Sequence, residues 1–195
     1  MSTLVYLRAI MGRDAEATKE RLVLAARTMF SERGFDGTTV REIAALAGVN
    51  PALINRYFGG KDQLFAEAVS IDLALPDLSQ TRREAVGATL AMHFFKRWEG
   101  DEHDDLLRVL IRTAATNPDA AARIREVLGR QVTPMIEALS DPETASQRAY
   151  LVASQILGLA YTRYVIGLPT TEIEHKRLVS VIGDTLRRYI LDPLP

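Results

Sequence analysis

The side chains best suited to chemistry in this chain gather in residues 39–58, which read TVREIAALAGVNPALINRYF. Asn55 could form hydrogen bonds with a nucleic-acid base, and adenine N6/N7 is the bidentate partner that suits an asparagine amide. Arg56 adds a positive charge beside it. These groups can read DNA only if a helix presents them to the major groove, so the elements around them decide their use.

The first half of this stretch has the pattern of a short amphipathic helix. Thr38 or Thr39 can cap its first backbone amides, and Glu42 stands near the capping-box position. Its apolar side chains recur at three- and four-residue spacing: Val40, Ile43, Ala44 and Ala47.

A second helical pattern follows Gly48. This glycine tolerates the positive φ of a helix end, and Asn50 is placed to cap a helix whose first position is Pro51. Two helices joined by a three- to four-residue turn with a glycine form a helix-turn-helix, whose second helix lies in the major groove. A pair of core helices with a tight corner is the alternative interpretation of the spacing alone.

The segment Thr18–Leu64 resembles the N-terminal DNA-binding domain of the tetracycline-repressor (TetR) family. The resemblance rests on anchors that occur in the family's order: Ala25-Ala26, Phe30, Gly34-Phe35, Thr38-Thr39-Val40, Ile43-Ala44, Ala47-Gly48-Val49, Tyr57-Phe58, Lys61 and Leu64-Phe65. At Asn55 the chain departs from the aromatic residue that many members carry. The resemblance implies a ligand-responsive repressor that binds a palindromic operator as a homodimer, with these candidate DNA contacts: Thr39, Arg41, Asn50, Pro51, Ala52, Asn55, Arg56, Tyr57 and Lys61.

Composition permits this function without specifying it. The chain has 195 residues, 47% hydrophobic and 25% charged, as is ordinary for a globular protein. Its net charge is −1, yet residues 1–61 hold nine Lys/Arg against six Asp/Glu, a net charge of +3. A modestly basic head on an acidic body suits a DNA-binding protein.

Several other classes of function lack the residues that they need. The sequence contains no cysteine, no long apolar run and no convincing signal peptide, so we expect a cytoplasmic protein without a membrane segment. The three histidines have no partners at catalytic spacing, and there is no Gly-rich phosphate loop. The acidic loop of residues 101–105 contains Asp, Glu and His, but adjacent loop residues do not converge easily on one ion. We therefore expect no enzyme, no cofactor and no metal.

The punctuation of the chain predicts an all-α fold of about nine helices with no strand. A first helix is expected from Asp14 to Arg33, after an arm of residues 1–13 without a helical pattern. We expect a three-helix DNA-binding domain at residues 14–60, a linking helix at 61–75 that ends before Pro76, and a helical effector-binding and dimerisation domain at 76–195. Its helices are expected at residues 82–99, 106–116, 118–139 with a bend at Pro134, 145–166 and 171–191, with Thr170 or Thr171 as the last cap.

The C-terminal half carries two expectations about partners. The helix of residues 145–166 is apolar on nearly every side, which indicates a homodimer interface with these candidates: Ala153, Ile156, Gly158, Ala160, Val181 and Leu186. The resemblance implies an effector pocket, and its aromatic candidates are Phe94, Trp98, Tyr150 and Tyr161. They favour an apolar or aromatic compound, although plain core aromatics are the alternative for each. A helical small-molecule or protein-binding module that does not bind DNA remains the competing function.

Overall fold

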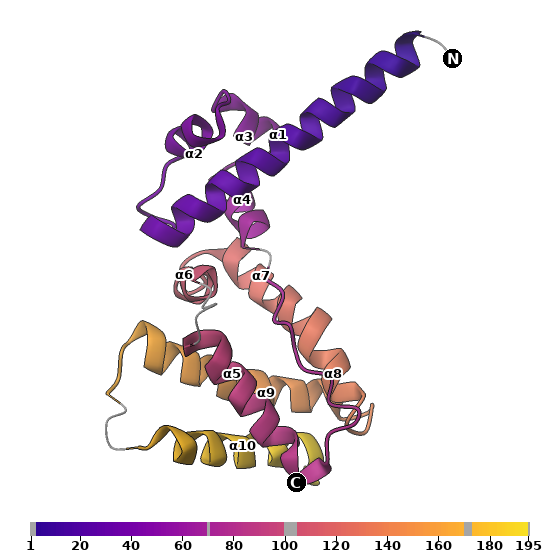
Figure 1. Cartoon of the computed structure of the whole chain (residues 1–195), viewed down its shortest axis with the longest axis vertical. Coiled ribbons are helices and arrows are strands. Elements are labelled where there is room, and N and C mark those ends of the chain that lie inside the picture. The colour runs from indigo at the N-terminus through magenta and orange to yellow at the C-terminus, as the bar shows by residue number, and fades with distance from the viewer. Residues whose placement is uncertain (1–2, 70, 100–104, 170–172, 195) are drawn as a thin grey trace. The chain divides into compact units, whose positions relative to one another are not determined.

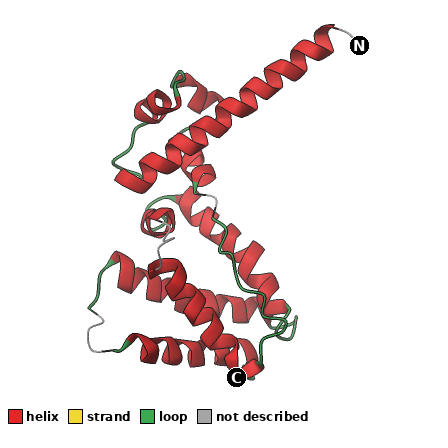
Figure 2. Cartoon of the chain, in the orientation of Figure 1, coloured by secondary structure: helices red, strands yellow, loops and turns green. Residues whose placement is uncertain are grey.

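The computed structural model describes residues 3–69, 71–99, 105–169 and 173–194, with side chains from Asp14 onward and excluding that of Asp105. These residues contain helices and loops and no strand, which confirms the all-α prediction (Figure 2). Figure 1 follows the α-helices in chain order: α1 Thr3–Arg33, α2 Val40–Ala47, α3 Ala52–Phe58, α4 Lys61–Ala68, α5 Val86–Glu99, α6 Asp105–Thr113, α7 Pro118–Val127, α8 Thr133–Glu137, α9 Ala145–Ala160 and α10 His175–Leu191. None of the described helices combines the length and apolar character needed to cross a membrane.

The chain forms two compact units. The first combines Met1–Ser70 with Asp105–Ala121, and the second combines Ile71–Asp104 with Ala122–Pro195. The predicted boundary near residue 76 therefore differs from the compact units at two places, because α6 and the start of α7 join the N-terminal unit while the chain from Ile71 joins the second. Contacts between distant segments cause the first difference, since the Asn117 side chain before α7 donates a hydrogen bond to Asp62 of α4.

The first unit is built around three aromatic rings. Phe65 of α4 lies edge-on to Phe30 of α1, with ring centroids 4.9 Å apart, and to Phe35 at 5.0 Å. Phe30 and Phe65 are fully buried together with Ile43 of α2 and Ile54 of α3. Burial of such side chains contributes about 1.5–3 kcal/mol each, so α1 and α4 form the rigid support on which α2 and α3 rest.

The second unit depends on a close helix crossing that the sequence reading did not identify. A Cβ atom added to Gly87 of α5 would lie 1.9 Å from the carbonyl oxygen of Gly183 in α10. Only glycine permits this backbone approach. By contrast, a Cβ on Gly158, which the sequence suggested for the homodimer interface, would meet no atom within 4 Å in the chain.

Several predicted helix boundaries are wrong, among them the start of α10, which lies at His175 with Glu174 as its N-cap and not at residue 171. The first helix starts at Thr3 and not near Asp14, because a single glycine at residue 12 costs about 1 kcal/mol without ending a helix. The linking helix α4 ends at Ala68, well before Pro76. Beyond it the chain is irregular, and Ala74 adopts a positive φ of 47°. Side chains from distant helices bind this segment's backbone, a non-local effect that no periodicity reveals.

Proline and asparagine residues predicted other helix boundaries correctly. The Asn117 side chain accepts a hydrogen bond from the Ala120 amide at 2.8 Å, and α7 begins at Pro118 as predicted. A π-helical turn at Leu128–Val132 comes just before Pro134, while the predicted bend at the proline stays a prediction. A second π-helical turn, Tyr161–Val165, extends α9 close to its predicted end. The predicted caps Thr170 and Thr171, and residues 101–104 of the acidic loop, lie outside the described residues.

Candidate functional site

Helix α2 starts with the capping box that the sequence predicted. The Thr39 hydroxyl oxygen accepts a hydrogen bond from the Glu42 amide at 3.3 Å, and a Glu42 carboxylate oxygen accepts from the Thr39 amide at 3.0 Å. The Thr39 hydroxyl also donates to that carboxylate at 2.6 Å. These hydrogen bonds from Thr39 hold the pKa of Glu42 below its usual range.

The turn between α2 and α3 also has the predicted geometry. Gly48 is left-handed, with φ 67° and ψ 39°, and its N–H donates to carbonyls at the end of α2. The Asn50 side chain then accepts a hydrogen bond from the Ala52 amide at 2.8 Å. The Asn50 contact agrees with the sequence reading, but α3 begins at Ala52 with Pro51 as its N-cap, one residue later than predicted.

Four of the candidate DNA contacts share one open face of α3 and its N-terminus. Pro51, Ala52, Asn55 and Arg56 are all exposed, whereas Ile54 on the opposite side is fully buried. The pairs 51/55 and 52/56 have the four-residue spacing that places side chains above one another on a helix. The amide of Asn55 and the guanidinium of Arg56 can therefore approach a single groove together, and both have the geometry for bidentate contacts with bases.

Basic groups lie around the end of α3 and the start of α4. Tyr57 is half-buried, with the Arg56 guanidinium carbon 5.8 Å and Lys19 Nζ 6.0 Å from its ring centroid. Lys61 Nζ lies 4.1 Å above the centre of the Phe35 ring. Lys19 of α1 was not among the sequence candidates, since the spacing of α1 alone does not show that its side chain reaches Tyr57.

Two of the candidate DNA contacts, Arg41 and Thr39, differ in how freely they can reach a phosphate. Arg41 is exposed on α2 and can reach outward. Thr39 uses both its hydroxyl hydrogen and its backbone N–H on Glu42. A phosphate contact from Thr39 therefore requires the Glu42 carboxylate to turn away, a cost that Arg41 does not carry.

The aromatic side chains suggested for an effector pocket are not all brought together. Phe94 and Trp98 of α5 are buried with ring centroids 5.7 Å apart. Tyr150 and Tyr161 are instead 73% and 39% exposed. Tyr164 is the residue that stacks on Trp98, with centroids 4.7 Å apart and planes 10° from parallel. It shares a helical stripe with the buried Ala160, and that spacing could have identified it from the sequence.

A charged network borders this aromatic cluster. The Glu99 carboxylate accepts hydrogen bonds from Arg163 Nε and from the Tyr164 hydroxyl, each at 2.7 Å. Burial alone raises the pKa of Glu99, but the hydrogen bonds from Tyr164 and Arg163 outweigh it and hold the pKa below its usual range. Burial and the contact with Glu99 raise the pKa of Tyr164. The hydroxyl therefore stays a hydrogen-bond donor at neutral pH.

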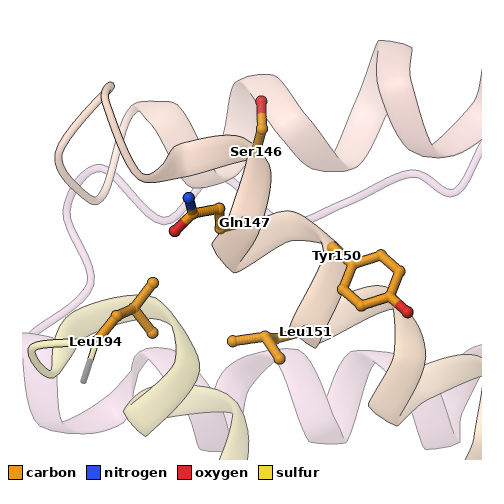
Figure 3. Close-up of a pocket in the computed structure, with 5 residues that line it drawn as sticks. All are labelled: Ser146, Gln147, Tyr150, Leu151 and Leu194. Atoms are coloured by element: carbon orange, nitrogen blue, oxygen red, sulfur yellow. The ribbon is translucent and has the colours of Figure 1, made fainter.

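A separate hollow of about 530 Å³ lies on the exposed side of α9. Its lining comes from α9 and the C-terminal end of the chain: Ser146, Gln147, Tyr150, Leu151 and Leu194. Figure 3 shows the Leu194 and Leu151 side chains facing this space, with the Tyr150 ring projecting from the same helix. Tyr150 thus contributes to a surface feature and not to the buried cluster around Trp98.

The candidate interface residues divide by exposure. Leu186 and Ala160 are fully buried and Ala153 is 9% exposed, so the chain itself already covers these three. They pack in the core of the second unit, and a contact between them and a partner stays a prediction. Ile156 is half-buried, while Gly158 and Val181 are exposed and remain candidates.

Two known families match successive parts of the chain. Residues 22–68 match the family described as bacterial regulatory proteins, tetR family. Residues 84–190 match the family described as tetracyclin repressor-like, C-terminal domain. The first match contains the capped helix pair, and the second covers more than half of the chain.

Individual relatives are named as HTH-type transcriptional regulators. The chain is 29% identical over 175 residues to the HTH-type transcriptional dual regulator CecR of Shigella flexneri, covering 90% of this chain and 64% of the relative. It is 30% identical over 168 residues to the HTH-type transcriptional regulator BetI of Brucella anthropi, covering 80% of this chain and 86% of the relative. It thus spans less than two thirds of the length of CecR.

Solved structures also share the fold. A TetR-family regulator from Streptomyces coelicolor A3 matches with a TM-score of 0.54 and 27% identity, over 91% of this chain and 96% of that one. A transcriptional regulator from Rhodococcus sp. Rha1 matches with a TM-score of 0.60 and 24% identity, over 91% and 99%. From the capped helix pair and the matches over both parts of its length, we conclude that the chain belongs to the TetR family of helix-turn-helix transcriptional regulators, which are not enzymes.

Proposed function

We propose that this protein is a ligand-responsive repressor that acts in the cytoplasm and binds a palindromic operator as a homodimer. The observation that carries the proposal is the open face of α3, where Pro51, Ala52, Asn55 and Arg56 are exposed above a buried Ile54. Gly48 and Asn50 fix the turn between α2 and α3. Helix α3 can therefore enter the major groove without a change in the turn's conformation. A relative from Streptomyces coelicolor is named an HTH-type transcriptional repressor, which supports the direction of regulation.

The residues of the head then have distinct roles. Asn55 and Arg56 contact base edges, for which adenine and guanine are the partners that match their bidentate geometry. Pro51 and Ala52 pack against the groove, while Arg41, Tyr57 and Lys61 contact phosphates and set the register. Asn50 acts through its cap on Ala52, and Thr39 through the start of α2.

The second unit contains the surface for dimerisation and the site for the effector. Val181 on α10 and Gly158 and Tyr150 on α9 are exposed, and a second copy of the chain would cover them. The effector is a small apolar or aromatic compound that binds at Phe94 and Trp98, with Tyr164 in place of Tyr161. Because these rings are in contact, the compound must separate them, and it shifts the protein only by its preference for the separated arrangement.

The test begins with selection of a preferred duplex from random DNA, followed by affinity measurements at several salt concentrations. A dimer that neutralises several phosphates should lose about 10³-fold or more in affinity between 50 and 200 mM salt. The selected sequence should be a palindrome with half-sites about one helical turn apart. No enriched sequence, or binding that ignores salt, would favour the competing module that does not bind DNA.

A further inference from the structure

The residues that follow α4 are held by side chains and not by a regular backbone pattern. We call residues 71–73 the linker segment. Leu73 N–H donates to Gln131 Oε1 at 2.7 Å, and the Ile71 carbonyl accepts from Gln131 Nε2 at 2.9 Å. The Asp72 carbonyl accepts from Arg97 Nη2 at 2.8 Å. All of these residues belong to the second compact unit.

Gln131 binds this segment as another peptide group would. Its amide uses one acceptor and one donor on backbone groups two residues apart, the alternation found between neighbouring strands. No other side chain repeats this pair of contacts at the same reach. Glutamate lacks the donor for Ile71, asparagine is one methylene shorter, and methionine has the length without the hydrogen bonds.

Gln131 is placed by a π-helical turn. The turn Leu128–Val132 joins α7 to α8, and the Thr133 amide donates to the Leu128 carbonyl, the i to i+5 bond of a π-helix. Such turns are rare and carry one extra residue per turn. Their conversion to regular α-helix shifts the register by one residue, which rotates a side chain by about 100° around the axis. That rotation would take the Gln131 amide off the linker segment.

Helix α5 holds the same segment from another direction. His93 Nε2 lies 2.9 Å from the Leu73 carbonyl oxygen, and Arg97 is four residues further along the same helix face. Phe94 and Trp98 are each one position later, so the aromatic cluster occupies the neighbouring face of α5, about 100° around. Any rotation of α5 that separates these rings also moves His93 and Arg97.

From these contacts we propose that Gln131 is a positioning residue for operator binding, because its amide fixes the linker segment through which the second unit controls α4. The proposal deepens the ligand-responsive repression argued above and rests on it. The proposal requires a second arrangement of the π-helical turn, in which the Gln131 amide has left the segment, beside the one in the structure. Coupling between the effector site and the operator-binding head needs such an element with two states, and binding at either site must shift the equilibrium between them.

The experiment compares Gln131→Glu with the unmodified full-length chain. Glutamate keeps the acceptor for Leu73 N–H but sets a second acceptor against the Ile71 carbonyl. Residue 131 should therefore release the linker segment. Hydrogen exchange at the Leu73 amide, followed by NMR, should become at least about tenfold faster. Affinity for the selected full operator should fall by about five- to a hundredfold, the usual range of coupling between sites.

A duplex with one half of the operator separates positioning from damage to the head. Half-site affinity should stay within about twofold of that of the unmodified chain, since Gln131 contacts the linker segment and not the exposed face of α3. Gln80→Glu is the matched control, because Gln80 is exposed in the turn before α5 and its change adds the same charge. Gln131→Met provides a second test should the glutamate variant fail to fold.

The outcomes are distinct. Unchanged full-operator affinity in a variant whose Leu73 amide exchanges faster overturns the positioning role of Gln131 and leaves the repressor proposal standing. An equal loss on full and half sites shows a merely structural role and also overturns it. If the unmodified chain selects no DNA sequence, the proposed function fails and this inference fails with it.

Discussion

Asn55 and Lys61 should affect DNA binding in different ways. Asn55→Ala removes a bidentate base contact, so it should relax discrimination at one base pair by about 1–3 kcal/mol. Lys61→Ala removes a phosphate contact and should weaken binding to every sequence, with a salt slope smaller by about one. Competition titrations with single-base operator variants at several salt concentrations distinguish the two effects.

Lys61 needs a control because it also packs on Phe35, with Nζ 4.1 Å from the ring centre. Melting of the Lys61 variant reports any loss of that contact, while Lys176→Ala removes an exposed lysine from the start of α10. The Lys176 variant should bind as the unmodified chain does. If Asn55→Ala weakened all operators equally, Asn55 would be a phosphate contact and not a base reader.

Glu99 links residue chemistry to pH. Its pKa is held below the usual value of 4.5, so its contribution to folding is present above that value and is lost as pH falls through the lower pKa of the folded state. The difference in unfolding free energy between the unmodified chain and Glu99→Gln should narrow as the pH falls below about 4.5. Urea unfolding at a series of pH values measures it.

The matched variant for this test is Glu143→Gln, which changes an exposed residue just before α9. It should show a much smaller pH-dependent difference. A difference for Glu99→Gln that grew on acidification would mean that burial dominates its pKa, contrary to the hydrogen bonds from Tyr164 and Arg163.

At the scale of elements, Gly48 isolates the cost of the turn in the helix-turn-helix. A Cβ added there would meet no atom within 4 Å, so Gly48→Ala is opposed only by the left-handed backbone, with φ 67°. We expect a loss of about 1–2 kcal/mol in stability. Gly129→Ala is the counterpart, since its Cβ also meets nothing and its φ is not positive. That variant should gain up to about 1 kcal/mol. Urea unfolding followed by circular dichroism measures both, and equal effects would refute the role of φ.

The elements that the sequence predicted correctly are those whose ends are set by capping and turn residues nearby in the chain. Gly48, Asn50 and Pro118 act on their own neighbours, so the capped pair α2–α3 and the start of α7 were predicted correctly. The end of α4 was not, because Gln131 and Arg97 bind the linker segment from far along the chain.

The limits at the candidate site have the same cause. The exposed face of α3 follows from helical spacing, whereas the cation–π contact of Lys19 with Tyr57 depends on how α1 crosses α3. Likewise, the Gly87–Gly183 approach needs the packing of α5 on α10, since each glycine is unremarkable within its own helix. Sequence spacing therefore predicts faces, and tertiary contacts decide which faces meet.

At the scale of the whole molecule, the dimer proposal depends on the exposed face of α9 and α10. Val181 is 54% exposed on α10, and Met92 on α5 is exposed to the same 54%, which makes the two residues a matched pair. A two-fold interface would contain the Val181 substitution twice. Val181→Glu would therefore bury two unpaired charges, at a cost of about 3 kcal/mol or more, equivalent to a hundredfold or larger rise in the dimer dissociation constant.

Met92→Glu places the same charge on a surface that we do not assign to the interface, and it should leave the dimer intact. Sedimentation equilibrium at micromolar concentration measures both variants beside the unmodified chain. Operator affinity should fall with dimerisation for Val181→Glu, because a single head retains only half of the contacts, while half-site binding persists. Dissociation by Met92→Glu alone would move the interface to α5. A monomeric unmodified chain would refute two-fold operator recognition, although each head could still bind DNA.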